Sequence, residues 1–264
     1  MKIAFSDFDG TLFFHDKECI PKKNIEAVKR WRASGNLFVL CSGRDVHSLM
    51  HEIKRQNLEY DYVICNNGGS IFDANLNVLK TFMPDKKQVE CLLHSDIVKA
   101  SWHILFSSAE MMRAKINSKD SQLMKYFASE KYKDQKILEQ ITIEEALEQM
   151  NIIQISLSYK DIKTTSEYVQ KIETDYENAF SANQNLNCID VCANGINKAS
   201  GIKALLNMNP TWNIEAVLTI GDAENDVPMI QDFSGYSLNS ATDIAKKHAK
   251  KLYDTVGDML EEHM

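Results

Sequence analysis

Two aspartates lie two positions apart, directly after the first apolar run of the chain. Residues 2–6 read KIAFS, and Asp7 and Asp9 follow, with Gly10 and Thr11 next. Residues two apart in extended chain point to the same side. The two carboxylates would then repel by about 4 kcal/mol at ~4 Å and an effective dielectric of roughly 20. Such a pair persists only with a shared proton, a bound metal ion or diverging side chains.

A second acidic segment follows another apolar run. Residues 216–220 (AVLTI) precede residues 221–226 (GDAEND), which include Asp222 and Asp226. By itself this segment is as typical of an ordinary helix N-terminus, where Asp and Asn are favoured, as of a functional acidic site. If its strand lay beside the first one, Asp222 would join Asp7 and Asp9 around one point. Three oxygen donors without a His or Cys partner suit a hard cation, Mg²⁺.

Two further segments could hold an anion. Ser42, Gly43 and Arg44 follow the apolar run 37–41 and open a helical pattern. A hydroxyl, a glycine N–H and a helix N-terminus together form an anion site. Lys198 also opens a helix, where it opposes the helix dipole, and this placement hints at an anion nearby. Ser-Gly turns and exposed lysines are also common without a ligand.

Alternating apolar runs and helical patterns indicate the elements that must position these residues. We expect strands at 2–6, 37–41 and 62–65, helices through 25–31 and 46–53, and a hairpin at 70–82. This order predicts a parallel sheet with helices on both faces. Ligands bind beyond the carboxyl ends of such strands, which is where the polar segments lie.

The composition changes after Met83 and Pro84 and changes back after Gly195. Between them we expect helices near 85–99, 120–134, 143–150 and 161–174, and strands near 102–116, 152–159 and 177–192. Beyond them we expect a helix at 199–207, strands at 216–220 and 235–238, and a helix at 241–250. The sequence therefore predicts a Rossmann-like, doubly wound α/β core, residues 1–83 and 188–264, interrupted by an α+β domain, residues 84–187.

Four motifs together resemble those of the haloacid dehalogenase (HAD) superfamily of phosphohydrolases. They are Asp-x-Asp-Gly-Thr at 7–11, Ser-Gly-Arg at 42–44, Lys198, and Gly-Asp-x-x-Asn-Asp at 221–226. The layout is similar to the Cof-type, sugar-phosphatase-like branch, which implies that residues 84–187 form a class IIB cap. Asn67-Gly68-Gly69 and Asn239-Ser240-Ala241 resemble that branch's Asn-Gly-Ala and late Asn-Ala segments. The chain departs from the pattern at residue 69 and at 254–258, which replace the usual alanine and Asp-Gly-Val order.

The resemblance implies a catalytic role for the first two acids. Asp7 would be the nucleophile that forms an aspartyl-phosphate. Asp9 would protonate the leaving oxygen and then deprotonate the hydrolytic water. Asp7, the Asp9 backbone carbonyl and Asp222 would hold Mg²⁺.

The same resemblance implies contacts to the phosphoryl group and supporting roles. Phosphoryl oxygens would be held by Ser42, Gly43, Lys198 and Asn225. Arg44 would contact the substrate or cap its own loop. Asp226 would orient Lys198 or a metal-bound water, and Thr11 would close the turn after Asp9.

These roles imply a phosphoric monoester hydrolase: an Mg²⁺-dependent phosphatase acting on small phosphorylated metabolites, such as sugar phosphates. Two alternatives use the same residues. One is a phosphotransferase or mutase that passes the aspartyl-phosphate to an alcohol. The other is a metabolite-binding regulator without catalysis, which the intact acidic and lysine motifs disfavour.

Composition narrows the class of partner. The 264 residues carry a net charge of −7, with 44% hydrophobic and 25% charged residues. Nucleic-acid binding draws on massed Lys and Arg, so this balance disfavours it. The six cysteines form no Cys-x-x-Cys pair, and no apolar run approaches the ~20 residues of a membrane span. We expect a cytoplasmic protein that binds neither nucleic acid nor membrane; its oligomeric state leaves no mark in the sequence.

Overall fold

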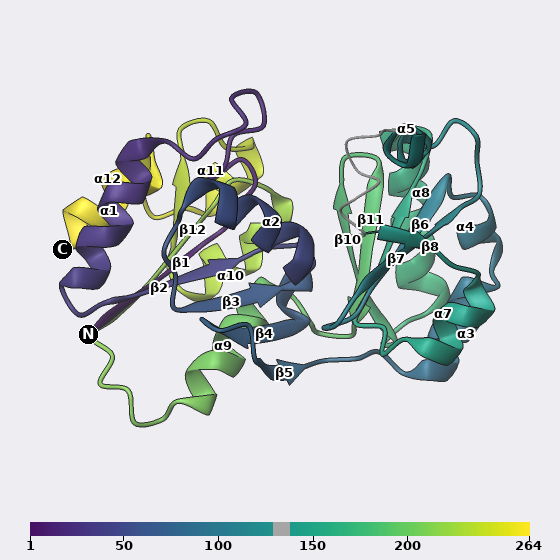
Figure 1. The fold of residues 1–264 in the computed structure, drawn as a ribbon, viewed down its shortest axis with the longest axis horizontal. Helices are drawn as coiled ribbons and strands as arrows, with labels where there is room; N and C mark the ends of the chain where they lie inside the picture. The colour runs from purple at the N-terminus through teal and green to yellow at the C-terminus, as the bar shows by residue number, and fades with distance from the viewer. Residues whose placement is uncertain (129–137) are drawn as a thin grey trace. The chain divides into compact units, whose positions relative to one another are not determined.

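The computed structural model describes residues 1–128 and 138–264, which form two compact units (Figure 1). The first unit comprises Met1–Lys80 and Asn197–Met264, and the second comprises Thr81–Ile196. The second unit is continuous in sequence and interrupts the first.

The first unit is built on an eight-stranded sheet with the order β14-β13-β12-β1-β2-β3-β4-β5. All pairs from β14 to β3 are parallel, and β4 runs antiparallel to β3. In that order the strands are Leu252–Tyr253, Tyr236–Leu238, Ala216–Gly221, Lys2–Ser6, Leu37–Cys41, Tyr62–Cys65, Ser70–Asp73 and Val78–Thr81. The central strands are apolar throughout because both faces of the sheet are covered.

Helices cover the two faces of this sheet in a doubly wound arrangement. The strand order runs outward in both directions from the centre, so right-handed crossovers place α1 and α2 on one face and α10 and α11 on the other. Accordingly, α1 packs against α12, and α9 packs against α10. The helices are α1 (Lys22–Ala33), α2 (Val46–Gln56), α9 (Lys198–Met208), α10 (Val227–Asp232), α11 (Asp243–His248) and α12 (Val256–His263), with 3₁₀ turns η1 (Asn66–Gly68) and η2 (Glu224–Asp226). The predicted α/β class is confirmed.

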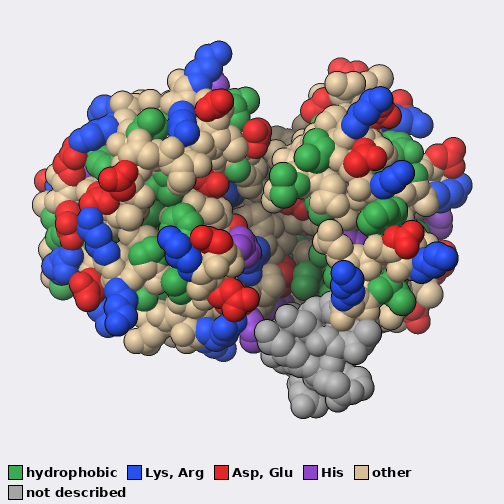
Figure 2. All heavy atoms as spheres, turned by 90° about the horizontal axis from the view of Figure 1, so that it is seen from above, with side chains coloured by type: hydrophobic (Ala, Val, Ile, Leu, Met, Phe, Trp, Pro, Cys, Tyr) green, Lys and Arg blue, Asp and Glu red, His purple; other side chains and the backbone are tan. Residues whose placement is uncertain are grey.

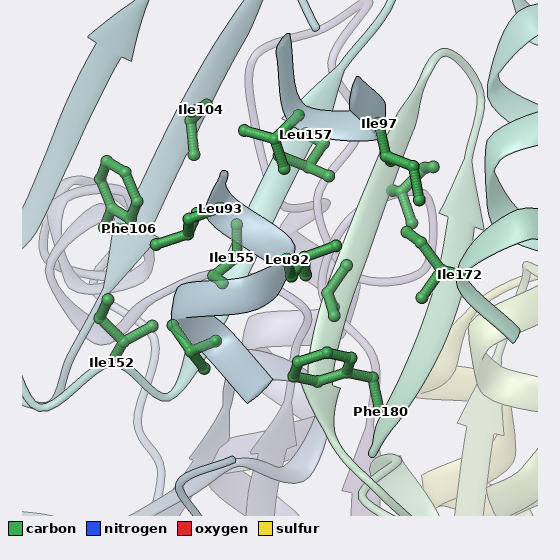
Figure 3. Packing of buried hydrophobic residues seen from close by; sticks show 14 of the residues in the cluster. Leu92, Leu93, Ile97, Ile104, Phe106, Ile152, Ile155, Leu157, Ile172 and Phe180 are labelled. Atoms are coloured by element: carbon green, nitrogen blue, oxygen red, sulfur yellow. The ribbon is translucent and has the colours of Figure 1, made fainter. Parts of the chain in front are cut away.

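The second unit is an α+β structure with a six-stranded sheet in the order β10-β11-β9-β6-β7-β8. In that order the strands are Phe180–Asn185, Cys188–Ala193, Gln154–Ser158, His103–Ser107, Met112–Ile116 and Leu138–Gln140. The helices are α3 (Lys86–Leu93), α4 (Asp96–Lys99), α5 (Gln122–Ala128), α7 (Ile143–Gln149) and α8 (Ile162–Asp175). Figure 3 shows the apolar cluster where helix residues such as Leu92 and Ile172 meet the sheet.

Alternate residues of the second sheet point into this cluster. Ile104 lies opposite Leu157, and both are fully buried. Polar residues occupy intervening positions, and two of them on β9, Gln154 and Ser158, are buried at 3% and 2% exposure. Strands β7 and β8 are parallel and need a crossover connection. Oγ of Ser121, the residue before α5, lies 2.9 Å from Nδ1 of His103.

Several elements differ from the sequence-based expectation. The strand expected at 102–116 is two strands, β6 and β7, and the helix at 85–99 is two helices, α3 and α4. Of the helix expected at 120–134, α5 ends at Ala128 and the remainder falls outside the described residues. Strands β8 and β14 and helices α10 and α12 were not predicted, because elements of two to eight residues carry too little periodicity.

The division between the units also lies elsewhere than the sequence suggested. Strand β11 pairs antiparallel with both β9 and β10, so the segment after residue 188 still belongs to the second sheet. The second unit therefore extends from Thr81 to Ile196. Composition marks the change poorly because β11 is as apolar as the strands of the first unit.

The surface carries charges of both signs. On the face shown in Figure 2, Lys and Arg side chains are interspersed with Asp and Glu rather than gathered into one patch. Among residues 1–128 and 138–264, no helix combines the length and the apolar character needed to cross a bilayer.

Helix α9 approaches the loop after β3 so closely that only glycine fits on both sides. Gly68 has φ +100°, and a Cβ there would lie 2.2 Å from the carbonyl oxygen of Asn197. A Cβ on Gly201 would lie 2.8 Å from Cα of Gly68. This backbone contact places Lys198, the first residue of α9, over the edge of the sheet.

Gly68→Ala is expected to destabilise the first unit by about 2–4 kcal/mol, because a left-handed alanine and a backbone clash add together. Gly35→Ala is the matched control: Gly35 has φ +80° but nothing lies within 4 Å of its added Cβ. The control should lose only the ~1–2 kcal/mol of the left-handed backbone. Urea midpoints measure both, and equal losses would contradict the close approach.

His103 provides a pH-dependent prediction for the second unit. Burial lowers its pKa to about 4, whereas the unfolded chain titrates near roughly 6.5. Between these values the unfolded chain binds more protons, so stability is full above roughly pH 6.5 and falls by up to about 3 kcal/mol as the pH drops toward 4. NMR titration of the imidazole and amide exchange of β6 at pH 5 and 7 measure the effect. His103→Gln should flatten the pH dependence, and a His103 pKa near the ordinary value would contradict it.

Candidate active site

The sheet topology brings the predicted polar segments to one edge. Strand β1 lies between β12 and β2, with Ser6 in register with Ile220 on one side and Leu40 on the other. Asp7, Asp222 and Ser42 follow the carboxyl ends of these three adjacent strands. The condition stated from the sequence, that the strand at 216–220 lies beside the first, is therefore met.

Lys198 lies between two carboxylates and touches both. Its Nζ is 2.5 Å from Oδ1 of Asp7 and 2.5 Å from Oδ1 of Asp226. The Lys198 side chain is 1% exposed. The unfavourable placement of a lysine at a helix N-terminus is thus explained, because its ammonium group pairs with two buried carboxylates and does not face solvent.

Asp226 anchors the loop after β12. Its Oδ2 accepts hydrogen bonds from the backbone N–H groups of Asp222 at 2.9 Å and Ala223 at 3.0 Å, while Oδ1 accepts from Lys198. A Cβ on Gly221 would lie 2.3 Å from Cγ of Asp226, so a glycine is needed there. Both carboxylate oxygens of Asp226 are engaged, which favours orientation of Lys198 as its role.

The cluster formed by Asp7, Asp222, Asp226 and Lys198 contains more acidic than basic side chains. Burial, with the nearby carboxylate of Asp226, raises the pKa of Asp7 well above its ordinary value, although Lys198 opposes the shift. Burial also raises the pKa of Asp222. For Lys198 burial alone would lower the pKa, but Asp226 and Asp7 together raise it. Within the described residues, three carboxylates here meet one ammonium group.

Thr11 and Gly10 position Asp222. Thr11 Oγ1 donates to Oδ1 of Asp222 at 2.6 Å. A Cβ on Gly10, whose φ is +81°, would lie 2.4 Å from the other carboxylate oxygen of Asp222. Thr11 was expected only to close the turn after Asp9, and its bond to the neighbouring acidic loop is an additional finding.

The donor set fits a hard divalent cation. Ligand atoms of Asp7, Asp222 and Asp226 all lie within 4.8 Å of one another. All are carboxylate oxygens, which suit Mg²⁺. Because Asp226 is already engaged, Asp7 and Asp222 are the side chains best placed to bind it.

The side chain of Asp9 points away from that of Asp7 and pairs with a different basic residue, Arg44. Arg44 donates from Nε to Oδ2 of Asp9 at 2.7 Å and from Nη2 to Oδ1 at 2.6 Å. His15 Nε2 lies 2.8 Å from the same Oδ1. Of the three ways in which the acid pair could persist, divergence is visible here: each carboxylate has its own basic partner. Arg44 thus reaches Asp9, and its backbone N–H donates to Oγ of Ser42 at 3.1 Å.

The predicted phosphate-binding residues lie around the same edge. Ser42 is 1% exposed, and its backbone N–H donates to the carbonyl of Ile64 in β3 at 2.8 Å. Asn225 Nδ2 donates to Oδ1 of Asn67 at 3.1 Å. A Cβ on Gly43 would lie 3.1 Å from that same oxygen. Asn67 therefore links the loops that carry Gly43 and Asn225.

Asn67 and His15 belong to the site although neither was predicted to do so from the sequence. Asn67 has a left-handed backbone, φ 51° and ψ 34°, directly after β3, and asparagine tolerates this conformation. An Asn-rich loop at the carboxyl end of a strand was the available signal. His15 had no comparable signal, because its contact with Asp9 depends on how the intervening turn folds.

The chain matches a known protein family, and its fold is shared with solved structures. The family model for haloacid dehalogenase-like hydrolases matches residues 4–258. The fold is shared with a haloacid dehalogenase-like hydrolase from B. subtilis, with a TM-score of 0.84, 18% identity and 100% of each chain covered. It is also shared with a HAD subclass IIB sugar phosphatase, with a TM-score of 0.80, 20% identity and 100% and 99% of the two chains covered. A structure assigned to the HAD/COF-like hydrolases, from Plasmodium vivax, has a TM-score of 0.79 and 22% identity over 100% and 95% of the chains.

Mg²⁺ is expected to stabilise the first unit against heat, because it balances the excess negative charge. At a hundredfold excess over its dissociation constant, the gain is about 2.7 kcal/mol. Asp222→Asn should raise the melting temperature without metal, since one like charge is removed, and should abolish the response to Mg²⁺. Asp232→Asn is the control, because Asp232 is 40% exposed and paired with Lys203. If Asp222→Asn kept the full thermal shift, the cation would bind elsewhere.

Proposed function

The chain belongs to the haloacid dehalogenase-like hydrolase family, and from this we propose that it is an Mg²⁺-dependent phosphatase of small phosphorylated metabolites. One observation carries the proposal: a nearly buried Asp7 at the end of the central strand, held by Lys198, which is held in turn by Asp226. A stable fold gains little from a buried network of this kind over apolar packing. A catalytic role accounts for the presence of this buried network.

Asp7 would act as the nucleophile. Its carboxylate attacks phosphorus as the ester P–O bond breaks, and the phosphoryl group is left on Asp7. Lys198 holds the attacking group in place at 2.5 Å and would meet the charge that spreads over the phosphoryl oxygens. Because Asp226 fixes the lysine from the other side, the lysine need not reorganise during the reaction.

Asp9 would move the protons. It gives a proton to the leaving oxygen in the first step and accepts one from the attacking water in the second. The water displaces Asp7 from phosphorus, so inorganic phosphate leaves and both acids return to their starting states. The divergence of Asp9 from Asp7 separates the proton carrier from the nucleophile.

Asp7, Asp222 and the Asp9 backbone carbonyl would hold the cation. When bound, Mg²⁺ offsets the repulsion between the carboxylate nucleophile and the phosphate ester. Thr11 serves this site by orienting Asp222.

Ser42, Gly43 and Asn225 would hold the remaining phosphoryl oxygens. A hydroxyl, a backbone N–H and a side-chain amide are suitable donors for charge that develops in the transition state. The bond between Asn225 and Asn67 would keep the amide in position.

The substrate class proposed is a small organic phosphate, such as a sugar phosphate. The shared fold with a HAD subclass IIB sugar phosphatase supports this choice. The second unit, as an inserted domain, would act as the cap that discriminates among leaving groups. Phosphoryl transfer to an added sugar alcohol instead of water would reveal a phosphotransferase, and release of inorganic phosphate would then fall as the acceptor became phosphorylated.

Asp7→Asn is expected to reduce hydrolysis of p-nitrophenyl phosphate at least about a thousandfold, since the nucleophile is lost. Wild-type protein quenched in acid during turnover should carry a phosphoryl group that hydroxylamine releases, and the variant should not. Asp232→Asn should retain both properties. Near wild-type activity in Asp7→Asn, with an intact fold by circular dichroism, would remove Asp7 as the nucleophile.

A further inference from the structure

We propose that His15 is a positioning residue that, with Arg44, sets the carboxyl group of Asp9 for proton transfer to the leaving group. This inference rests on the proposed function, in which Asp9 is the proton carrier. It concerns a residue that no motif of the sequence marks.

The turn after β1 returns His15 to the site. The backbone N–H of Phe14 donates to the carbonyl of Cys19 at 3.1 Å, which closes the segment between them into a tight loop. Phe13 stacks on the buried ring of Phe8 at 5.3 Å. The imidazole of His15 meets Phe13 edge to face at 5.2 Å. The ring is therefore held from the side as it points to Asp9.

The two carboxylate oxygens of Asp9 accept different numbers of hydrogen bonds. Oδ1 accepts from Arg44 Nη2 at 2.6 Å and lies 2.8 Å from His15 Nε2. A carboxylate oxygen has two acceptor positions, so these two donors saturate Oδ1. Oδ2 accepts one bond, from Arg44 Nε at 2.7 Å. Among the interactions of the described residues, Oδ2 is thus the oxygen with an acceptor position left for a proton.

The direction of the His15 bond follows from chemistry. Oδ1 only accepts hydrogen bonds, whether Asp9 is ionised or carries its proton on Oδ2, so Nε2 of His15 carries the hydrogen in this arrangement. Arg44 alone would fix the plane of the carboxylate through its two parallel bonds. The third bond from His15 resists rotation of the Asp9 side chain when a substrate phosphate draws on the Arg44 charge.

His15 contributes little to folding, which makes its function measurable. Its side chain is 66% exposed and that of Asp9 is 33% exposed. Side-chain pairs this exposed contribute ~1 kcal/mol or less to stability. Placement of a proton donor is more demanding, because a shift of about 1 Å can cost a hundredfold in rate. Loss of the imidazole should therefore appear in catalysis before it appears in stability.

The test compares two phosphate esters whose leaving groups differ in their need for a proton. An alkoxide leaves poorly without protonation, whereas p-nitrophenolate leaves well. In His15→Ala, kcat/KM for glycerol 2-phosphate should fall about tenfold, while kcat/KM for p-nitrophenyl phosphate stays within about twofold. This parameter covers the steps through departure of the leaving group, so the role of Asp9 toward water does not enter it.

Two variants complete the design. His15→Gln retains an N–H donor of similar reach and should restore the ratio of the two kcat/KM values. His47→Ala removes an exposed histidine of α2 and should change neither value. Equal losses for both esters, or no loss for either, would overturn the positioning role while leaving the phosphatase proposal intact. A wild-type protein that hydrolyses neither ester with Mg²⁺ would overturn the proposed function, and the role of His15 with it.

Discussion

The structure depends on one buried charge interaction, the bond of Lys198 to Asp7 and Asp226. A lysine that is 1% exposed must be paired, because an unpaired buried ammonium is costly. Pairing it requires three distant segments to meet: the end of β1, the start of α9 and the loop after β12. The close approach of Gly68 and Gly201 brings α9 to this point. The sheet order and the helix packing are thus the means by which one ammonium group is placed.

Distribution of charge among the acids follows from the same constraint. Asp7 and Asp9 are separated by one residue, yet Asp7 bonds to Lys198 and Asp9 to Arg44. The divergence removes the repulsion that would arise if both carboxylates pointed to one place. It leaves an excess of negative charge at Asp7 and Asp222, where a hard cation fits. It also leaves Asp9 in a separate network with Arg44 and His15, which is the arrangement that the proposed proton transfer uses.

The second unit is organised by different physics. Its sheet is antiparallel except for β7 and β8, and one face packs on helices through a continuous apolar cluster. The other face carries polar residues that bond to one another, with Gln154 Nε2 donating to Oγ of Ser156 at 3.1 Å. An independent core lets such a unit vary in sequence without disturbing the charge network of the first. An inserted domain of this kind is therefore a natural place for substrate discrimination in the proposed phosphatase.

The sequence by itself determined the strands and helices that carry strong periodicity, from Lys2–Ser6 to Ala216–Gly221, and the acids that follow them. These signals are local, since a buried strand and its polar end are adjacent in the chain. It also indicated the α/β class and the family, because four motifs occur in a fixed order. Short edge strands and the limit of the second unit at Ile196 were decided by pairing between distant segments. Likewise, only the tertiary structure decided that Arg44 binds Asp9, that Thr11 orients Asp222, and that His15 and Asn67 belong to the site. Each of these depends on the direction of a side chain across a turn or a sheet edge, and the spacing of residues along the chain does not specify that direction.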